Sequence, residues 1–508
     1  MKNRDFLFEL IATMSRAEKR KCVAFLNFVG SEPIVIELFE KFAKSRSPEK
    51  VKAWGEQNLA FYRKKKSQLK KEVMNFLRFS RESRTPANQI TQLIEEFEVL
   101  YPRGLYVECQ RLMQRAYDVA VKNRQLLPLM KILDLRKKLE VEQNPKALKS
   151  ELGELVALKD EVLEKFELEV KWGKLHYQLL ALFRLGREFW PEEKEMLAGV
   201  LAEDSAQFRS FAPLVSHRTI LYFWSARALA HKLLGEQQGY YESYKELCAF
   251  FDQNAGFRDL PENRRTYRNM LSNYANACFA IEDYREAKGI LNQIRAFKNK
   301  DFDEEAEQFQ AYTLLSLLYY INSADQVGKD ELIEETVAGL EKYSAKINAA
   351  RRVSILMNLV FLCFVNDEFG RAEWFLERLL DGSRLRVRRE VVKSAKLLGL
   401  ILLVEKESFK GADSLEIAFE STRMFVERNG GKNEVDRTIF RMVWKLLKGG
   451  GEAAGPILEE WHEKFQELMA THANHPLTEI ILFWLRSKIE GVPIAKLIRS
   501  KQMEKQEG

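Results

Sequence analysis

Two segments of the chain follow one pattern, in which a helix, a short acidic turn and a second helix succeed each other. The turns run from Glu282 to Ala287 and from Asp367 to Ala372, so they begin 85 residues apart. This interval leaves room for one further unit between them if each unit has about 42 residues. A helical hairpin of this kind exposes an apolar face that only a neighbouring hairpin can bury. The sequence therefore predicts an all-α fold, an α-solenoid of stacked antiparallel helical hairpins.

The composition favours long helices joined by short loops. Of the 508 residues, 46% are hydrophobic and 31% are charged, whereas only 25 are glycine and 12 are proline. Such a chain has enough apolar residues for a large core but few turn formers, which argues against a strand-rich fold.

The net charge of +7 is concentrated near the N-terminus, because residues 1–90 contain 20 Lys/Arg and only 10 Asp/Glu. One long helix is expected from Gln57 to Ser83, with apolar residues gathered on one side. At 100° per residue, a basic stripe projects from the neighbouring side. The members of this basic stripe are Arg63, Lys64, Lys71, Arg78 and Arg81. Phosphate binding is one interpretation of the stripe, with Phe61 and Tyr62 nearby for base stacking, and a solvated helix face is the other.

The cysteines and the hydropathy of the sequence indicate the cellular compartment of the protein. The five cysteines are scattered and include no Cys-x-x-Cys pair, which is typical of buried thiols in a reducing compartment. Asp5 and Glu9 interrupt the segment that would have to be the apolar core of a secretory signal. The longest uncharged stretches, Gln308 to Ala324 and Val353 to Asn366, are too short and too polar to span a membrane. We expect a cytoplasmic protein that does not enter a membrane.

At Tyr284 and Ala287, and again at Phe369 and Ala372, the sequence resembles the tetratricopeptide repeat. The repeat has small residues where its two helices cross and an aromatic residue at the start of the second helix. Val360 replaces one of the small residues, and the unit is longer than the 34 residues of the family, so the repeats are degenerate. The resemblance implies a binding protein whose concave face is lined by the first helix of each hairpin.

The N-terminal third carries a second resemblance. Leu7 to Ile11, Met14 to Arg20, Leu100-Tyr101 and Gly104 to Tyr106 are similar to segments of an uncharacterised bacterial family of helical-repeat proteins. The resemblance covers residues 1 to about 140 and brings no activity with it, so it bears on architecture alone.

The distribution of charge and the start and stop signals of the predicted helices divide the chain into five parts. We expect a basic N-terminal helical region at 1–84, hairpins with degenerate repeats at 85–235 and a tetratricopeptide-like repeat core at 236–430. Capping helices follow at 431–500 and a disordered tail at 501–508. Within the second part, helices are predicted from Leu126 to Glu142 and, as one long helix or two, from Lys146 to Leu185.

The repeat register predicts a peptide-binding groove on the concave side. Asparagines there can hydrogen-bond a peptide backbone or a terminal carboxylate, and arginines add positive charge. The predicted groove residues are Asn269, Ser272, Asn276, Arg265, Arg351, Arg352, Met357 and Phe361. The alternative is that the asparagines are solvated and that Phe361 and Phe364 are buried against a neighbouring repeat.

The chain lacks the motifs of common catalytic and metal sites. Gln466 occupies the position at which a zinc protease helix beginning with His462 needs its second histidine. His472 and His475 are better explained as exposed residues at a helix end. The glycines at 430 and 431 lack the flanking residues of a nucleotide loop. We predict no catalytic residue, no metal ligand and no cofactor.

The leading functional hypothesis is a non-enzymatic adaptor or scaffold that recognises a protein or peptide partner in the concave face of a solenoid. The alternative is a nucleic-acid-associated regulator whose basic N-terminal helices contact phosphate. An enzyme with a site assembled by the fold is a third class, and no residue supports it specifically.

Overall fold

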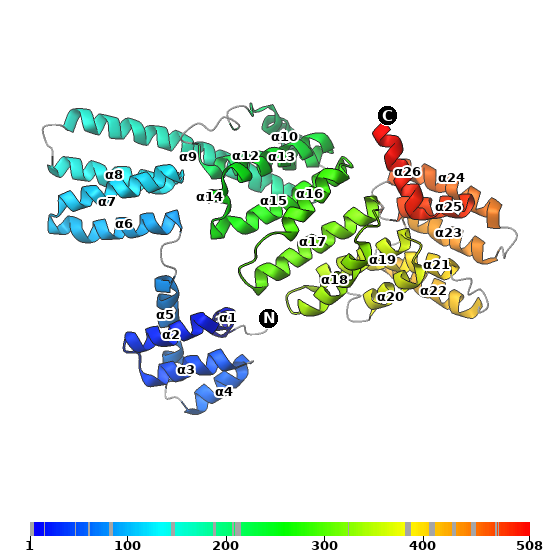
Figure 1. The fold of residues 1–508 in the computed structure, drawn as a ribbon, viewed down its shortest axis with the longest axis horizontal. Coiled ribbons are helices and arrows are strands. Elements are labelled where there is room, and N and C mark those ends of the chain that lie inside the picture. The colour runs from blue at the N-terminus through cyan, green and yellow to red at the C-terminus, as the bar shows by residue number, and fades with distance from the viewer. Residues whose placement is uncertain are drawn as a thin grey trace. The chain divides into compact units, whose positions relative to one another are not determined.

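The fold was analysed in a computed structural model, in which every regular element of the described residues is helical (Figure 1). The structure describes residues 5–507 except 15, 46, 59–60, 81–84, 144–147, 186–188, 206–207, 209–214, 324, 382–387, 406–411, 429–432, 449–453, 473–474 and 476. The prediction of an all-α chain is therefore confirmed. No helix in the described ranges combines the length and the apolar character needed to cross a bilayer.

The chain divides into two compact units. The N-terminal unit comprises Met1–Val170 and Phe211–His217, and the C-terminal unit comprises Lys171–Ser210 and Arg218–Gly508. The first unit starts with α1 (Phe6–Thr13), α2 (Arg16–Phe28), α3 (Pro33–Lys44), α4 (Pro48–Asn58) and α5 (Tyr62–Ser80). It continues with α6 (Pro86–Leu100), the 3-10 helix η1 (Tyr101–Arg103), α7 (Tyr106–Lys122), α8 (Leu126–Gln143) and the first part of α9 (Leu148–Leu185).

The expected single helix from Gln57 to Ser83 is wrong, because α4 ends at Asn58 and α5 begins at Tyr62. Phe61 has a φ of 62°, in the left-handed region that breaks a helix of L-residues. The break lets the ring of Tyr62 lie against Gly55, where a Cβ atom would be only 2.3 Å from Tyr62 Cε2. Tyr62 joins the hydrophobic cluster of α1–α5 in this way.

Helices α6 to α9 enclose a second hydrophobic cluster, to which α6, α7 and α8 contribute buried side chains such as Phe97, Met113 and Leu133. Helix α6 is capped at its start by Thr85, whose Oγ1 accepts a hydrogen bond of 3.2 Å from the amide of Asn88. Helix α8 closely matches its predicted bounds, and α9 is one uninterrupted helix.

The C-terminal unit consists largely of helix pairs joined by short connections. Its early helices are α10 (Pro191–Ala202), α12 (His217–Leu234), α13 (Gln237–Gln253), α14 (Ala255–Arg258), α15 (Pro261–Ala280), α16 (Tyr284–Arg295), α17 (Phe302–Ser323) and α18 (Lys329–Lys342). Its later helices are α19 (Ala349–Val365), α20 (Phe369–Leu380), α21 (Arg389–Glu405), α22 (Ala412–Arg428), α23 (Glu434–Lys448), α24 (Ala454–His472), α25 (Thr478–Glu490) and α26 (Ile494–Glu507). Two helices, α17 and α18, thus occupy the interval between the two segments with matching patterns.

The first helices of successive pairs contact one another. Helix α15 packs against α17, α17 against α19, α19 against α21 and α21 against α23. Most of these first helices also pack against the second helix of their own pair, as α15 does against α16 and α19 against α20. This arrangement places one face of α15, α17 and α19 side by side.

The two acidic turns have the same backbone geometry. Glu282 has a φ of 61° and Asp367 a φ of 60°. In the first turn the amide of Asp283 donates to the carbonyl of Cys278 over 2.9 Å, and in the second the amide of Glu368 donates to that of Cys363 over 2.9 Å. The internal similarity of the sequence therefore extends to hydrogen bonds that close the first helix of each pair.

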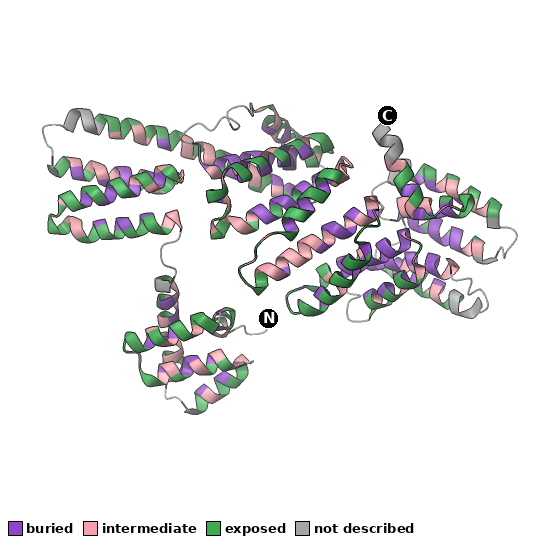
Figure 2. Cartoon of the chain, viewed as in Figure 1, coloured by how far each residue is buried: buried purple, intermediate pink, exposed green. Residues whose placement is uncertain are grey.

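Helix α19 is buried along most of its length, as Figure 2 shows. It lies within a hydrophobic cluster that extends from Ala306 in α17 to Ile498 in α26. The C-terminal end was expected to be disordered from residue 501, but α26 continues to Glu507. The amide of Ile494 donates to Asp367 Oδ2 over 3.1 Å, and Gln502 donates to the carbonyl of Asn322. Hydrogen bonds to residues distant in sequence thus hold α26 in place, although its own sequence from residue 501 is polar and charged.

Candidate peptide-binding groove

A groove of about 830 Å³ lies across α15, α17 and α19 in the C-terminal unit. Its lining is mostly polar or charged, with apolar residues contributed by α17. The lining residues are Arg265, Arg268, Asn269, Ser272, Asn273, Asn276, Glu307, Gln310, Ala311, Leu314, Leu315, Leu318, Lys346, Asn348, Arg351 and Ser354. The volume falls within the range of about 300–1,000 Å³ that is usual for ligand pockets.

Two arginines of α15 share one carboxylate of α17 at the end of the groove. Arg265 Nη2 lies 3.1 Å from Glu307 Oε1, and Arg268 forms an ion pair with the other oxygen of Glu307. The side chain of Arg265 is 73% exposed, whereas that of Arg268 is 3% exposed. The buried guanidinium also donates to the carbonyl of Glu304 over 3.4 Å. Arg268 is therefore a buried charge fixed in the wall of the groove, whereas the charge of Arg265 is exposed to solvent.

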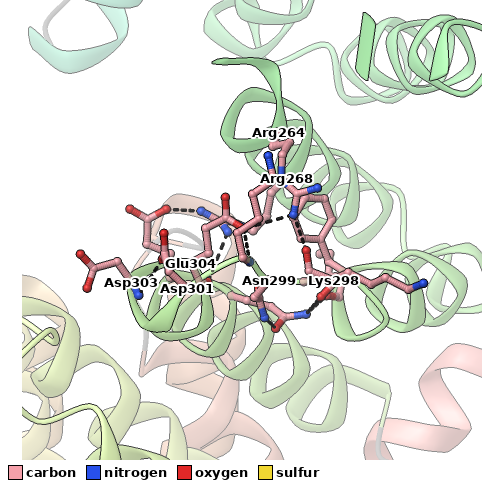
Figure 3. A network of polar contacts seen from close by, with 12 residues as sticks. Arg264, Arg268, Lys298, Asn299, Asp301, Asp303 and Glu304 are labelled. Atoms are coloured by element: carbon pink, nitrogen blue, oxygen red, sulfur yellow. Dashed lines mark hydrogen bonds and ion pairs between the residues drawn. The ribbon is translucent and has the colours of Figure 1, made fainter. Parts of the chain in front are cut away.

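A polar network holds the start of α17 against α15 (Figure 3). Arg264 Nη2 lies 3.1 Å from Glu304 Oε2, and the same oxygen accepts a hydrogen bond of 2.9 Å from the amide of Lys300. Burial raises the pKa of Glu304, but the hydrogen bonds from Arg264 and Lys300 outweigh burial and leave the pKa below its usual value. The carboxylate therefore stays ionised at neutral pH and keeps the two helices in register.

Amides and a hydroxyl on α15 cover the middle of the groove. Ser272 donates to the carbonyl of Arg268 over 3.0 Å, and Asn276 donates to that of Ser272 over 2.8 Å. Asn273 donates to the hydroxyl of Tyr244 over 3.0 Å, which fixes its amide. Asn269 is exposed and has no hydrogen-bond partner for its side chain among the described residues. Its amide can thus both donate to and accept from a bound backbone.

The third wall is the start of α19 and the residues just before it. Asn348 caps this helix, because its Oδ1 accepts a hydrogen bond of 2.9 Å from the amide of Arg351. Lys346 forms an ion pair of 2.6 Å with Asp303. The guanidinium of Arg351 is exposed and is paired with no carboxylate in the part of the chain that the structure describes. The groove is consequently lined by four cationic side chains and one carboxylate.

Five of the eight predicted groove residues line this groove, namely Asn269, Ser272, Asn276, Arg265 and Arg351. The remaining three do not. Met357 and Phe361 are buried, with 3% and 9% of their surface exposed, because α17, α20 and α21 cover the middle of α19. Arg352 points to α18 instead, where it donates to the carbonyl of Leu340 over 2.7 Å. Their assignment to the groove is corrected accordingly, and Phe364 is buried as well.

Sequence reasoning missed the residues that α17 contributes, above all Glu307 and Gln310. The two segments with matching patterns lie on either side of this helix, so they gave no register from which to select its exposed positions. The spacing of three residues between Glu307 and Gln310, followed by Leu314, is a helical periodicity that could have identified this face.

The basic stripe lies on a different helix, α5 of the N-terminal unit. Arg63, Lys64, Lys71 and Arg78 are all exposed there. The fifth predicted member, Arg81, lies outside the described residues. The stripe and the groove are therefore built from separate elements of the chain.

Other residues considered for chemistry are held in structural roles. Contrary to expectation, His475 is not an exposed residue, because its side chain is 13% exposed and its Nε2 lies 3.7 Å from Asp436 Oδ1. The five cysteines are buried free thiols, as predicted. Burial raises the pKa of Cys22 and of Cys363 to about 12, so both thiols stay protonated and unreactive at neutral pH.

The chain was compared with family models, curated proteins and solved structures, and none of the three comparisons gives a match.

Proposed function

We propose that this protein is a cytoplasmic, non-enzymatic adaptor or scaffold that holds an acidic, extended protein segment in the groove of α15, α17 and α19. In this proposal the helix pairs of the C-terminal unit form an α-solenoid of degenerate tetratricopeptide-like repeats. The matching turns at Glu282 and Asp367 and the contacts between successive first helices support the proposed architecture.

The chemistry of the groove supports the choice of ligand. Arg265 and Arg268 share one carboxylate, and Arg351 is paired with none among the described residues, so the groove has an excess of positive charge that favours a segment with Asp or Glu residues. Asn269 and the neighbouring amides suit the backbone of an extended peptide, which presents both donors and acceptors. Leu314 and Leu318 add apolar surface for one or two side chains of the ligand.

The groove is preorganised for this role. Arg268 and Asn273 are fixed by hydrogen bonds within the protein, so their rotamers are set before a ligand arrives. Each side chain that is already ordered spares about 0.5–1.5 kcal/mol of ordering entropy on binding. Arg265 and Arg351 remain exposed and can adjust to the ligand.

A selection from displayed random dodecapeptides on the full chain tests the proposal. We expect the selected peptides to be enriched in Asp and Glu. Fluorescence anisotropy should then show that Arg351→Glu weakens their binding about tenfold or more, because it replaces an attractive charge with a repulsive one. Asn269→Ala should weaken binding by a smaller factor, since it removes one neutral hydrogen-bonding group.

The matched control is Arg285→Glu, which makes the same charge change at an exposed position on α16 outside the groove. This variant should bind the selected peptides within about twofold of the wild type. Peptides without acidic enrichment, or equal losses in the Arg351 and Arg285 variants, would contradict the proposed groove.

A further inference from the structure

Helix α5 presents a continuous cationic face to solvent. Its buried side, which includes Leu69, Val73 and Phe76, packs into the cluster of α1–α5. Seven side chains between Tyr62 and Arg78 are exposed, and all of them are polar. These are Arg63, Lys64, Ser67, Lys70, Lys71, Asn75 and Arg78, five of which are cations. At 1.5 Å per residue, the face is about 22 Å long from Arg63 to Arg78.

The protein neutralises only the cations at the border of this face. Lys65 forms an ion pair with Glu32, and Lys66 forms one of 2.6 Å with Asp5. Glu72, the acidic residue of α5, accepts hydrogen bonds from Ser31 and Gln68. The fifth exposed cation, Lys70, lies over the ring of Phe6, with its Nζ 4.8 Å from the ring centroid. Within the described ranges, the other four, Arg63, Lys64, Lys71 and Arg78, form no ion pair and constitute the α5 quartet.

We propose that the α5 quartet binds the phosphate backbone of a single-stranded nucleic acid, as a second binding site that is independent of the peptide groove. Four uncompensated cations along one helix match a partner with regularly spaced negative charges. Ser67 and Asn75 lie among them on the exposed side and can donate hydrogen bonds to phosphate oxygens.

Phe61 is the reason to prefer a single strand. This phenylalanine is 80% exposed, directly precedes α5 and has a left-handed backbone conformation that is unfavourable for an L-residue. An exposed aromatic ring beside a cationic track can stack on an unpaired base, whose faces are inaccessible in a duplex. The position of Phe61 at the end of the quartet therefore fits a strand that runs along α5.

An anionic membrane fits this face less well. A helix that lies on a membrane inserts its apolar side among the lipids. The apolar side of α5 is instead buried in the protein, where Leu69 and Val73 are each 0% exposed. The quartet can thus contact charged groups but has no apolar face of its own to insert.

Fluorescence anisotropy of the full chain with labelled 20-nucleotide oligo-dT and oligo-U tests this proposal. If four phosphates are neutralised, affinity should fall about 50-fold between 50 and 200 mM KCl. The variant Lys64→Glu, Lys71→Glu and Arg78→Glu should lose binding at every salt concentration. Phe61→Ala should weaken binding between about 5-fold and 150-fold, as expected for the loss of one stacked base.

The control makes the same change of net charge at exposed positions away from α5, with Arg115→Glu, Lys174→Glu and Arg285→Glu. This control should retain most of the affinity, and circular dichroism should show both triple variants folded. The proposal is overturned if the wild type does not bind either oligonucleotide at 50 mM KCl, or if both triple variants lose affinity equally. It is also overturned if phosphatidylserine vesicles bind the quartet and the oligonucleotides do not. The peptide-binding experiment is unaffected by any of these outcomes.

Discussion

Arg265 and Arg268 show how the same residue type serves two purposes within one helical turn. Both guanidinium groups pair with Glu307, but 73% of the Arg265 side chain is exposed and only 3% of the Arg268 side chain. An exposed pair is screened by water and contributes little to stability. A buried cation contributes through its packing and its hydrogen bonds, and its removal leaves those groups without a partner.

Replacement of these two arginines should therefore affect stability unequally. Arg268→Ala is expected to lower the free energy of unfolding by about 2–3 kcal/mol, below the full effect of breaking a buried pair because Glu307 can still be hydrated. Arg265→Ala should lower it by less than about 1 kcal/mol. Urea denaturation followed by tryptophan fluorescence can measure both, because seven of the eight tryptophans lie in the C-terminal unit. If the two variants lost equal free energy of unfolding, the ion pair with Glu307, and not the burial of the arginine, would determine how much each arginine stabilises the protein.

The sequence predicted exposed residues correctly on helices that have one face uncovered by other helices. The asparagines of α15 were placed on the exposed side by the repeat register, and Asn269 and Asn276 do line the groove. The same reasoning failed for Met357 and Phe361, since periodicity identifies a face but not the number of helices that cover it. The apolar character of α19 on all sides was the available signal that it is a buried helix.

At the scale of elements, the second acidic turn has a role that the first does not share. Asp367 and Glu282 have nearly the same φ, yet Asp367 also accepts a hydrogen bond of 3.1 Å from the amide of Ile494 at the start of α26. A carboxylate at this position satisfies one of the free amides at a helix start and interacts favourably with the helix dipole. The turn of one helix pair thus caps a helix that follows 127 residues later.

Loss of the Asp367 carboxylate should loosen α26 selectively. Asp367→Gly tolerates the left-handed φ but removes the acceptor, so amide hydrogen exchange in α26 should accelerate about 2-fold to 30-fold, which corresponds to about 0.5–2 kcal/mol. Asp367→Asn keeps an acceptor and also tolerates this backbone conformation, so it should exchange nearly as slowly as the wild type. Exchange that is equally fast in both variants would show that the hydrogen bond to Ile494 does not hold the helix.

The elements themselves were largely predictable, and the exceptions depend on distant contacts. Helix α6 begins at its capping residue, and α8 closely follows its apolar pattern, because both signals are local. The end of α4 was missed since it depends on Tyr62 packing over Gly55. The end of the chain was wrongly expected to be disordered, because the residues that bind α26, Asp367 and Asn322, lie far from it in sequence. No local pattern reports such contacts.

At the scale of the whole molecule, each compact unit has hydrophobic clusters of its own. The clusters of α1–α5 and of α6–α9 belong to the N-terminal unit. The cluster that extends from Ala306 to Ile498 belongs to the C-terminal unit. A chain whose cores are separate in this way is expected to depart from two-state unfolding.

Calorimetry of the full chain should therefore resolve more than one transition, and single substitutions should shift them separately. Arg268→Ala should lower only the transition of the C-terminal unit. Leu69→Ala removes a side chain with 0% exposure from the core of α1–α5, so it should lower the midpoint temperature of a transition of the N-terminal unit. The corresponding loss in that unit's free energy of unfolding is about 2–5 kcal/mol. A single transition that both variants lower equally would show that the units unfold together. In that case nucleic-acid binding on α5 would also stabilise the peptide groove, because ligand binding to the native state stabilises the whole cooperative unit.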